Sequence, residues 1–443
     1  MNAIMDFLDK HLIPIADKLN NNRYLTALRD AFMLSLPLIM FGSIFVVISN
    51  LPYLDRLFGT GSITKLKYWL GAAPNATMSI MTLFVVFGMS YSLCRYYKVE
   101  AIYGAAVAVS SFLLLTPSVL QYGKTSREAV NGVILLDRLG AKGMFAGIIA
   151  AIIATEIYRK VIEKNWTIKM PEGVPTAVSK SFSSLIPATI TLSFFLILRI
   201  IFSVTPWGNI HDFIYEIIQR PLLLLGSGIV ATLIAIFFTQ LFWFFGLHGQ
   251  IVMNSVLDPI WRTLSLENFQ AYQAGEKHLP HIITKQFIDT FTVGMGGTGM
   301  TMAVIIGILI FARSKQLKEL AKLAGPPGIF NVNEPVIFGL PIVLNPILLI
   351  PWITAPIIIT GFTYFVMYIG LVPPPVGVDV PRTVPIFFSG ILATNSVAGG
   401  ILQIVNLSIV LIIWLPFIII IDRKYHKTEI ELKAAVETRE IST

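Results

Sequence analysis

The chain has 443 residues, of which 55% are hydrophobic and 13% are charged, and its mean hydropathy is +0.74. Because a soluble domain carries about 25% charged residues, this composition excludes an ordinary soluble protein and predicts an all-α polytopic membrane protein in a lipid bilayer. The net charge of +8 does not indicate a nucleic-acid partner, since Lys and Arg lie mainly at the edges of apolar runs.

Residues 1–29 predict an amphipathic helix that lies along the membrane interface. Apolar residues recur every three or four positions, with charged residues between them: Met5, Leu8, Leu12, Ile15 and Leu19. Acidic Asp6 and Asp9, and the absence of a long apolar core before Leu34, argue against a cleaved signal peptide. We therefore expect the first hydrophobic segment to remain in the mature protein.

Apolar runs of the length that a spanning helix needs, about 17 to 25 residues, follow along the chain. They lie at about 31–49, 73–94, 101–120, 140–158, 182–203 and 221–245, and a last run covers about 400–421. Together with the interrupted segments between them, they predict about ten spanning helices and one or two re-entrant pieces.

Basic clusters follow several of these runs. They comprise Arg95 and Lys98; Arg159, Lys160, Lys164 and Lys169; the segment Arg313 to Lys322; and Arg423, Lys424 and Lys427. By the positive-inside rule we expect both termini on the cytoplasmic side. The bias is not uniform, because further cations fall in loops assigned outside: Arg56, Lys65, Lys67, Lys124 and Arg127.

The sequence contains a single cysteine, Cys94, at the end of an apolar run. One thiol excludes an internal disulfide, a Cys-rich metal site and a Cys-x-x-Cys redox centre, so we expect a packed side chain, no metal and no cofactor. His-Glu-x-x-His is absent, and Gly-x-Ser-x-Gly does not occur in a suitable context, which argues against an intramembrane hydrolase.

From residue 246 onward, Gly, Pro, Asn, Thr and lone ionisable residues interrupt the apolar runs. Residues 243–262 place His248 between two glycines, with aromatic and polar side chains near it: Trp243, Gly249, Gln250 and Asn254. Flanking glycines let a ligand approach the backbone, and an imidazole exchanges a proton near neutral pH. The pattern predicts a hydrogen-bonding cluster; the alternative is a histidine bonded to a neighbouring carbonyl.

Residues 293–301 read Val-Gly-Met-Gly-Gly-Thr-Gly-Met-Thr. They lack the Gly-Lys-Ser/Thr end of a phosphate-binding loop, and no strand precedes them, so we exclude a nucleotide loop. In an apolar context they predict a broken helix or re-entrant turn that presents backbone groups to a substrate, with Gly297, Thr298 and Gly299 at its centre. Close helix packing through small residues is the alternative.

Residues 325–341 contain one carboxylate, Glu334, which follows Asn333 and lies among prolines and glycines. Prolines and glycines break a continuous helix, and an ionisable side chain at membrane depth marks a functional site by default. Glu334 is therefore the first candidate for ligand binding. The alternative is a surface connection after the basic segment Arg313 to Lys322.

Several phrases of the sequence are distinctive: Gly-Leu-His-Gly at 246–249, Val-Leu-Asp-Pro-Ile-Trp at 256–261, Ser-Lys-Gln-Leu-Lys at 314–318, Gly-Ile-Phe-Asn-Val-Asn-Glu-Pro-Val-Ile-Phe-Gly-Leu-Pro at 328–341 and Leu-Val-Pro-Pro-Pro-Val-Gly at 371–377. They resemble enzyme IIC of the lactose/cellobiose branch of the bacterial phosphotransferase system. The similarity is closest in the second half of the chain.

This resemblance implies a homodimeric, multi-pass permease of the bacterial inner membrane that is not itself an enzyme. Residues 30–220 would form a helical bundle with the dimer contact. Residues 221–425, with two re-entrant hairpins, would bind and translocate a disaccharide such as cellobiose or diacetylchitobiose, and residues 426–443 would be a cytoplasmic tail. A separate or fused enzyme IIB would phosphorylate the C6 hydroxyl of the sugar from a phosphocysteine.

Carried onto this sequence, the resemblance implies that His248 and Glu334 hydrogen-bond the sugar near that hydroxyl, with either one a candidate proton acceptor. Asn333, Gln250 and the backbone from Gly296 to Gly299 would help to hold the rings. These residue types suit a neutral sugar, which needs charge-assisted acceptors, amides and aromatic faces such as that of Trp243.

One position departs from the family pattern. After the triple proline the family usually reads Val-Pro-Trp-Thr-x-Pro, where this chain has Arg382. A guanidinium stacks as an indole does but adds a fixed charge, which suggests a different or acidic saccharide; an arginine that reaches toward the interface is the alternative. From the residues alone, an ion-coupled secondary transporter of a small polar solute also stays open.

Overall fold

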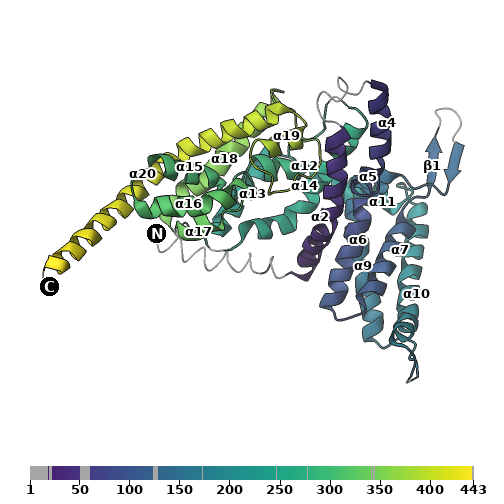
Figure 1. Cartoon of the computed structure of the whole chain (residues 1–443). Helices are drawn as coiled ribbons and strands as arrows, with labels where there is room; N and C mark the ends of the chain where they lie inside the picture. Colours follow the sequence, from purple (N-terminus) through teal and green to yellow (C-terminus); the bar gives the residue numbers. More distant parts are fainter. Residues whose placement is uncertain are drawn as a thin grey trace. The chain divides into compact units, whose positions relative to one another are not determined.

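The computed structural model describes residues 18, 22–49, 60–122, 128–171, 173–245, 247–276, 278–340, 342 and 345–441. This part is mostly helical, as predicted, with one antiparallel pair of strands, β1 (Val119–Tyr122) and β2 (Glu128–Asn131) (Figure 1). Of the interfacial helix expected over residues 1–29, residues 1–17 and 19–21 lie outside the described residues, and residues 23–29 begin helix α2.

Contacts divide the chain into two compact units. The N-terminal unit comprises the described residues of 17–226 and 254–275, and the C-terminal unit those of 227–253 and 276–443. Residues 254–275 belong to the N-terminal unit in this division, and the functional domains expected over 30–220 and 221–425 stay a prediction. Helix α14 (Gly249–Gln273) therefore begins in the C-terminal unit and continues in the N-terminal unit.

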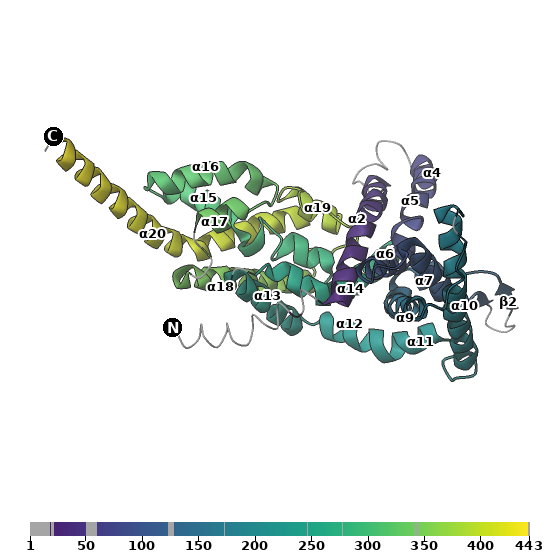
Figure 2. The same ribbon diagram turned by 90° about the horizontal axis from the view of Figure 1, so that it is seen from below.

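The N-terminal unit is a bundle of long helices that lie side by side (Figure 2): α2 (Arg23–Ser49), α6 (Met81–Tyr96), α7 (Ala101–Leu115), α9 (Met144–Glu163) and α10 (Thr176–Ser203). Short elements connect them: α4 (Thr60–Leu70), α5 (Ala72–Asn75), η1 (Met78–Ile80), α8 (Leu136–Leu139), η2 (Ala141–Gly143), α11 (Ile210–Ile214), η3 (Tyr215–Gln219) and α12 (Arg220–Gly226). Helix α6 contacts α2, α7 and α9, and α10 packs against α7 and α9.

Small residues let these helices approach closely. A Cβ at Gly88 of α6 would lie 2.9 Å from the Cα of Ala31 on α2. Cys94 is fully buried, and a Cβ at Gly104 would lie 2.3 Å from its sulfur. The cysteine is thus a packed side chain, as its place in the sequence predicted.

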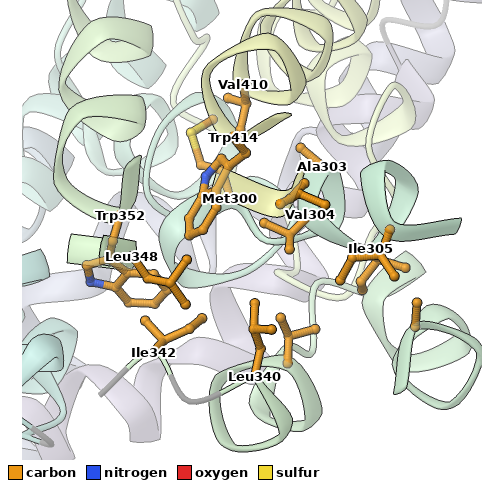
Figure 3. Close-up of a cluster of buried hydrophobic side chains, with 14 of the residues drawn as sticks. Met300, Ala303, Val304, Ile305, Leu340, Ile342, Leu348, Trp352, Val410 and Trp414 are labelled. Atoms are coloured by element: carbon orange, nitrogen blue, oxygen red, sulfur yellow. The ribbon is translucent and has the colours of Figure 1, made fainter. Parts of the chain in front are cut away.

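The C-terminal unit combines long helices with short, interrupted ones: α13 (Ile229–Phe244), η4 (Phe287–Phe291), η5 (Thr298–Met300), α15 (Met302–Phe311), α16 (Lys315–Ile329), α17 (Glu334–Gly339), α18 (Pro346–Tyr368), α19 (Phe388–Thr394) and α20 (Val397–Ile441). Its apolar core includes Met300, Trp352 and Trp414, which come from the glycine-rich turn, α18 and α20 (Figure 3). This core holds the glycine-rich turn and α17 in place, because side chains from both are buried in it, including Met300, Val336 and Ile337.

Buried amides on α20 satisfy backbone groups that the interrupted helices leave open, as a low-dielectric environment requires. Gln403 Oε1 accepts the N–H groups of Phe387 at 2.8 Å and Gly390 at 2.7 Å, and its Nε2 donates to the carbonyl of Thr290 at 2.7 Å. Asn406 Nδ2 donates to the Thr363 hydroxyl at 2.8 Å. One face of α20 therefore connects α18, α19 and η4.

Helix α16 begins where α20 supplies carboxylates. Asp422 Oδ1 accepts the backbone N–H groups of Arg313 and Ser314, each at 2.8 Å. Glu429 Oε1 accepts the Ser314 hydroxyl at 2.7 Å and the N–H of Gln316 at 2.9 Å. Carboxylates at a helix N-terminus pair with backbone donors and complement the helix dipole, so α20 caps α16 from outside.

Five described helices are long and apolar enough to span a membrane: Arg23–Val46, Lys65–Tyr96, Thr176–Ser203, Ile347–Tyr368 and Val397–Glu431; Ile210–Gly226 taken together with Ile229–Phe244 makes a sixth. The predicted single helix over 221–245 is wrong. Helix α12 ends at Gly226 and α13 begins at Ile229, because glycine at 226 and 228 permits a break, and Gly228 has an extended ψ of 137°. The total of about ten spans stays a prediction.

Candidate functional site

The glycine-rich stretch forms a turn between η4 and α15, as the broken-helix interpretation predicted, rather than the face of a packed helix. Gly296, Gly297 and Gly299 have φ values of +70°, +83° and +75°, a region that favours glycine. A Cβ at Gly297 would lie 2.4 Å from Cγ of Asn333, and one at Gly299 would lie 2.2 Å from the Trp352 ring. Glycine is required here because both neighbours touch the backbone.

A buried hydrogen-bond network links this turn to two other predicted segments. Asn333 Nδ2 donates to the Thr298 carbonyl at 2.6 Å and to the Thr301 hydroxyl at 2.9 Å. The Thr298 hydroxyl donates to Gln250 Oε1 at 3.0 Å. The exposed fractions of Asn333, Thr298 and Gln250 are 6%, 5% and 7%. The structure thus brings together three residues that the sequence pointed to separately.

His248 lies directly before α14, and its ring centroid is 4.3 Å from that of Trp243 near the end of α13. Nδ1 of His248 accepts the backbone N–H of Ile251 at 3.3 Å, so the imidazole caps the helix. With Nδ1 as acceptor, the neutral ring carries its proton on Nε2, which is then a donor. The histidine is exposed, and this bond to Nδ1 comes from a backbone N–H.

The glycine after His248 has a packing role. A Cβ at Gly249 would lie 2.0 Å from the carbonyl oxygen of Thr239, so only glycine lets α14 start this close to α13. Gly246 lies outside the described residues. Asn254 is half-buried on α14 and belongs to the N-terminal unit, whereas the other predicted site residues belong to the C-terminal unit.

Glu334 is the first residue of α17, with Pro335 in the first turn, a position that proline tolerates. Its side chain lies outside the described part of the structure, so its role stays a prediction. Asn333 holds the N-cap position, yet its amide bonds the glycine-rich turn and not the first turn of α17. The segment before Glu334 is therefore fixed to the turn by the residue adjacent to the carboxylate.

Arg382 pairs with a carboxylate that the sequence analysis did not single out. Its Nη2 lies 2.8 Å from Asp289 Oδ1, and Lys285 Nζ lies 3.4 Å from the same oxygen. Asn331 was also missed, although its Oδ1 accepts the N–H of Gly296 at 2.9 Å. Asp289 carries the same signal as Glu334, namely a lone carboxylate in an apolar segment, and Asn331 belongs to the same Asn-Val-Asn phrase as Asn333.

Two side chains on α13 have buried polar atoms without hydrogen-bond partners within the described part of the chain. Gln240 is fully buried, and neither its Oε1 nor its Nε2 makes a hydrogen bond there; the same holds for Nε1 of Trp243. The backbone carbonyl of Gln240 accepts the indole N–H of Trp352 at 3.0 Å. Gln240 therefore lies beside Trp352, whose ring contacts Gly299. A buried amide without partners costs about 1–3 kcal/mol, which a bound polar ligand would offset.

Comparisons with known proteins point in one direction. A family model described as "Phosphotransferase system, EIIC" matches residues 29–356. The oligo-beta-mannoside-specific EIIC component of the PTS system of Bacillus subtilis (strain 168) is 57% identical over 416 residues, which cover 94% of this chain and 93% of that protein. The cellobiose-specific EIIC component of Geobacillus stearothermophilus is 40% identical over 435 residues, covering 96% and 95%.

A solved structure is similar over nearly the whole chain. The crystal structure of the transporter ChbC, the IIC component from the N,N'-diacetylchitobiose-specific phosphotransferase system, has a TM-score of 0.90 and 42% sequence identity. The similarity covers 96% of this chain and 99% of that one.

Proposed function

This chain belongs to the EIIC family of the phosphotransferase system, and from this premise we propose that it is the permease for a neutral β-linked disaccharide or short oligosaccharide. The family match over residues 29–356 carries the proposal. The names of the similar proteins suggest the sugars to test: cellobiose, a β-mannoside and diacetylchitobiose.

The geometry of the C-terminal unit supports a sugar site at the glycine-rich turn. A disaccharide presents many hydroxyls on faintly apolar rings, so its site needs amides, hydroxyls and aromatic faces in a largely dry setting. The turn is surrounded by such groups, in Asn333, Thr298 and Gln250, and Trp243 lies against His248. In this proposal the Gln240 amide and the Trp243 indole N–H, which lack partners in the described part of the chain, would supply further bonds for sugar hydroxyls.

In this proposal the chain binds and presents the sugar, and the phosphoryl group comes from an enzyme IIB. The S–P bond of the IIB phosphocysteine breaks, an O–P bond forms at the C6 hydroxyl, and the hydroxyl proton passes to Glu334 or His248. Phosphorylation makes uptake one-way, because the charged product does not readily cross back through an apolar barrier. In this proposal the chain orients the sugar and accepts the hydroxyl proton, and it has no other role in the phosphoryl transfer.

The remaining parts of the proposal concern assembly and topology. We place the protein in the bacterial cell membrane (the inner membrane), with both termini cytoplasmic, about ten spanning helices and re-entrant segments formed by the interrupted helices of the C-terminal unit. The N-terminal helical bundle would form the homodimer contact. Cross-linking of single cysteines introduced on its outward faces, in a Cys94→Ala background, would report that contact.

Uptake into proteoliposomes tests the function. We expect labelled cellobiose to accumulate inside as its phosphate only when phosphorylated IIB is enclosed. Accumulation of unmodified sugar driven by a proton or sodium gradient without IIB would instead identify an ion-coupled secondary transporter. Failure of every tested β-linked sugar to bind or to be phosphorylated would overturn the proposed substrate class.

A further inference from the structure

The segment that carries Arg382 is fastened to the glycine-rich turn by one side chain. Asn331 Nδ2 donates to the carbonyls of Arg382 at 2.5 Å and Val384 at 2.9 Å, while its Oδ1 accepts the N–H of Gly296 at 2.9 Å. Asn331 itself has a φ of +62°, a conformation that asparagine tolerates better than most residues. The Arg382 segment is therefore held against the same glycine-rich turn to which Asn333 is bonded. We call this segment the wall.

One carboxylate contacts both cations of this region. Asp289 Oδ1 lies 2.8 Å from the Arg382 guanidinium and 3.4 Å from the Lys285 ammonium. The side chains of Asp289 and Lys285 are 10% and 3% exposed, whereas that of Arg382 is 47% exposed. A second carboxylate nearby, Asp379, accepts a hydrogen bond from Gln286. Asp289 thus faces two cations, and only the arginine presents a large exposed surface.

The junction itself is too small for a saccharide. A cavity of about 10 Å³, enough for about one water molecule, is lined by Asp289, Asn331, Arg382 and their neighbours. A sugar would therefore lie against the exposed side of Arg382 and not between the paired groups. The affinity of the protein for an anionic sugar then depends on how far Asp289 already compensates the guanidinium charge of Arg382.

We propose that Asp289 is a specificity-determining residue: by pairing with Arg382 it lowers the positive charge that this wall presents, so that neutral saccharides are preferred to anionic ones. The inference rests on the proposed function and refines its substrate class. It also revises the expectation that Arg382 selects an acidic sugar, because the charge that would attract a carboxylate is already paired. Asp289 acts through Arg382 and need not touch the sugar.

The test compares two ligands of similar shape, cellobiose and a β-linked disaccharide with one uronic acid, by calorimetry on the purified protein. We expect Asp289→Asn to raise the ratio of uronate to cellobiose affinity about tenfold, as charge-assisted hydrogen bonds to Arg382 become available to the ligand. The gain should fall as salt is added, because the guanidinium is half exposed. Adding Arg382→Gln to the Asp289→Asn protein should remove most of this gain in the affinity ratio.

Asp289→Asn also removes a partner of buried Lys285 and can impair folding. In the double variant Lys285→Met, Asp289→Asn the buried ammonium is removed together with its carboxylate partner. This protein should show the same gain in the affinity ratio. Glu319→Gln, which removes an exposed ion pair with Lys322 on α16, is the matched control and should leave the ratio unchanged. An unchanged ratio in a folded Asp289 variant, or a gain that survives Arg382→Gln, overturns the inference. A wild-type protein that binds neither disaccharide overturns the proposed function instead.

Discussion

The Thr298 hydroxyl donates a hydrogen bond to Gln250 Oε1 at 3.0 Å and so joins the glycine-rich turn to the start of α14. Asn333 extends the connection to the segment before Glu334 through the Thr298 carbonyl. Because all three side chains are more than nine-tenths buried, each depends on the others for its hydrogen bonds. Removing one member should therefore alter both the stability and the sugar affinity of the site.

Asn333→Ala should be the most informative change in this network. It leaves the Thr298 carbonyl and the Thr301 hydroxyl without this donor, at a cost of about 1–3 kcal/mol in the free energy of unfolding, and we expect about a tenfold loss of disaccharide affinity. Thermal unfolding and calorimetry measure the two effects. Asn345→Ala, which removes the N-cap of α18, should cost about 1 kcal/mol of stability and leave the affinity unaltered.

Gly297→Ala should disrupt the site although it adds one methyl group. The residue has φ +83° and ψ 168°, a glycine region that costs other residues about 1–3 kcal/mol, and the new Cβ would displace Asn333. We expect loss of sugar binding in a protein that still folds. Gly361→Ala on α18, where a Cβ meets open space, should bind normally. Equal behaviour of the two variants would mean that the turn has no part in binding.

Glu334→Gln keeps the shape of the side chain and removes its charge. If Glu334 accepts the hydroxyl proton, phosphorylation by IIB should slow about 10²–10⁴-fold, with a smaller loss of sugar affinity. His248→Gln, measured in the same way, shows which of the two residues is the proton acceptor. Only the variant that lacks the acceptor should show the large decrease in the phosphorylation rate. Unimpaired binding and phosphorylation in Glu334→Gln would remove the residue from the site.

A paired size exchange tests the packing of the N-terminal bundle. Gly104→Ala places a Cβ 2.3 Å from the Cys94 sulfur, and overpacking of this kind costs about 1–3 kcal/mol. Cys94→Ala removes the sulfur and should restore most of the lost stability in the double variant, because the two sites are in contact. Thermal unfolding of the four proteins of this cycle gives the coupling. Additive losses would show that Cys94 does not pack against Gly104.

Three residues of the candidate site could be singled out from residue type alone. Gln250, Thr298 and Asn333 are polar residues in apolar surroundings, where polar side chains need partners, and the structure brings them together. Asp289 obeys the same rule as Glu334, but its partner Arg382 lies 93 residues away. Hydrophobic periodicity carries no information on such a distant pair, so its geometry needed the fold.

Other features depend on backbone geometry that hydropathy does not register. The run 221–245 is predominantly apolar, yet the glycines at 226 and 228 divide it into α12 and α13. Glycine next to His248 suggested room for a ligand, whereas at Gly249 the space is occupied by the Thr239 carbonyl. A glycine in a sequence indicates close approach, and only the fold tells which group approaches.

The carboxylates of Asp422 and Glu429 give the C-terminal half of α20 a structural role, because they cap the N-terminus of α16. A shortened chain ending before Asp422 would leave the first backbone donors of α16 without these acceptors, and α16 leads directly to Asn331 and Asn333. Trimming this helix to improve expression or crystallisation would therefore loosen the proposed saccharide site from a distance, and affinity tags belong beyond residue 441.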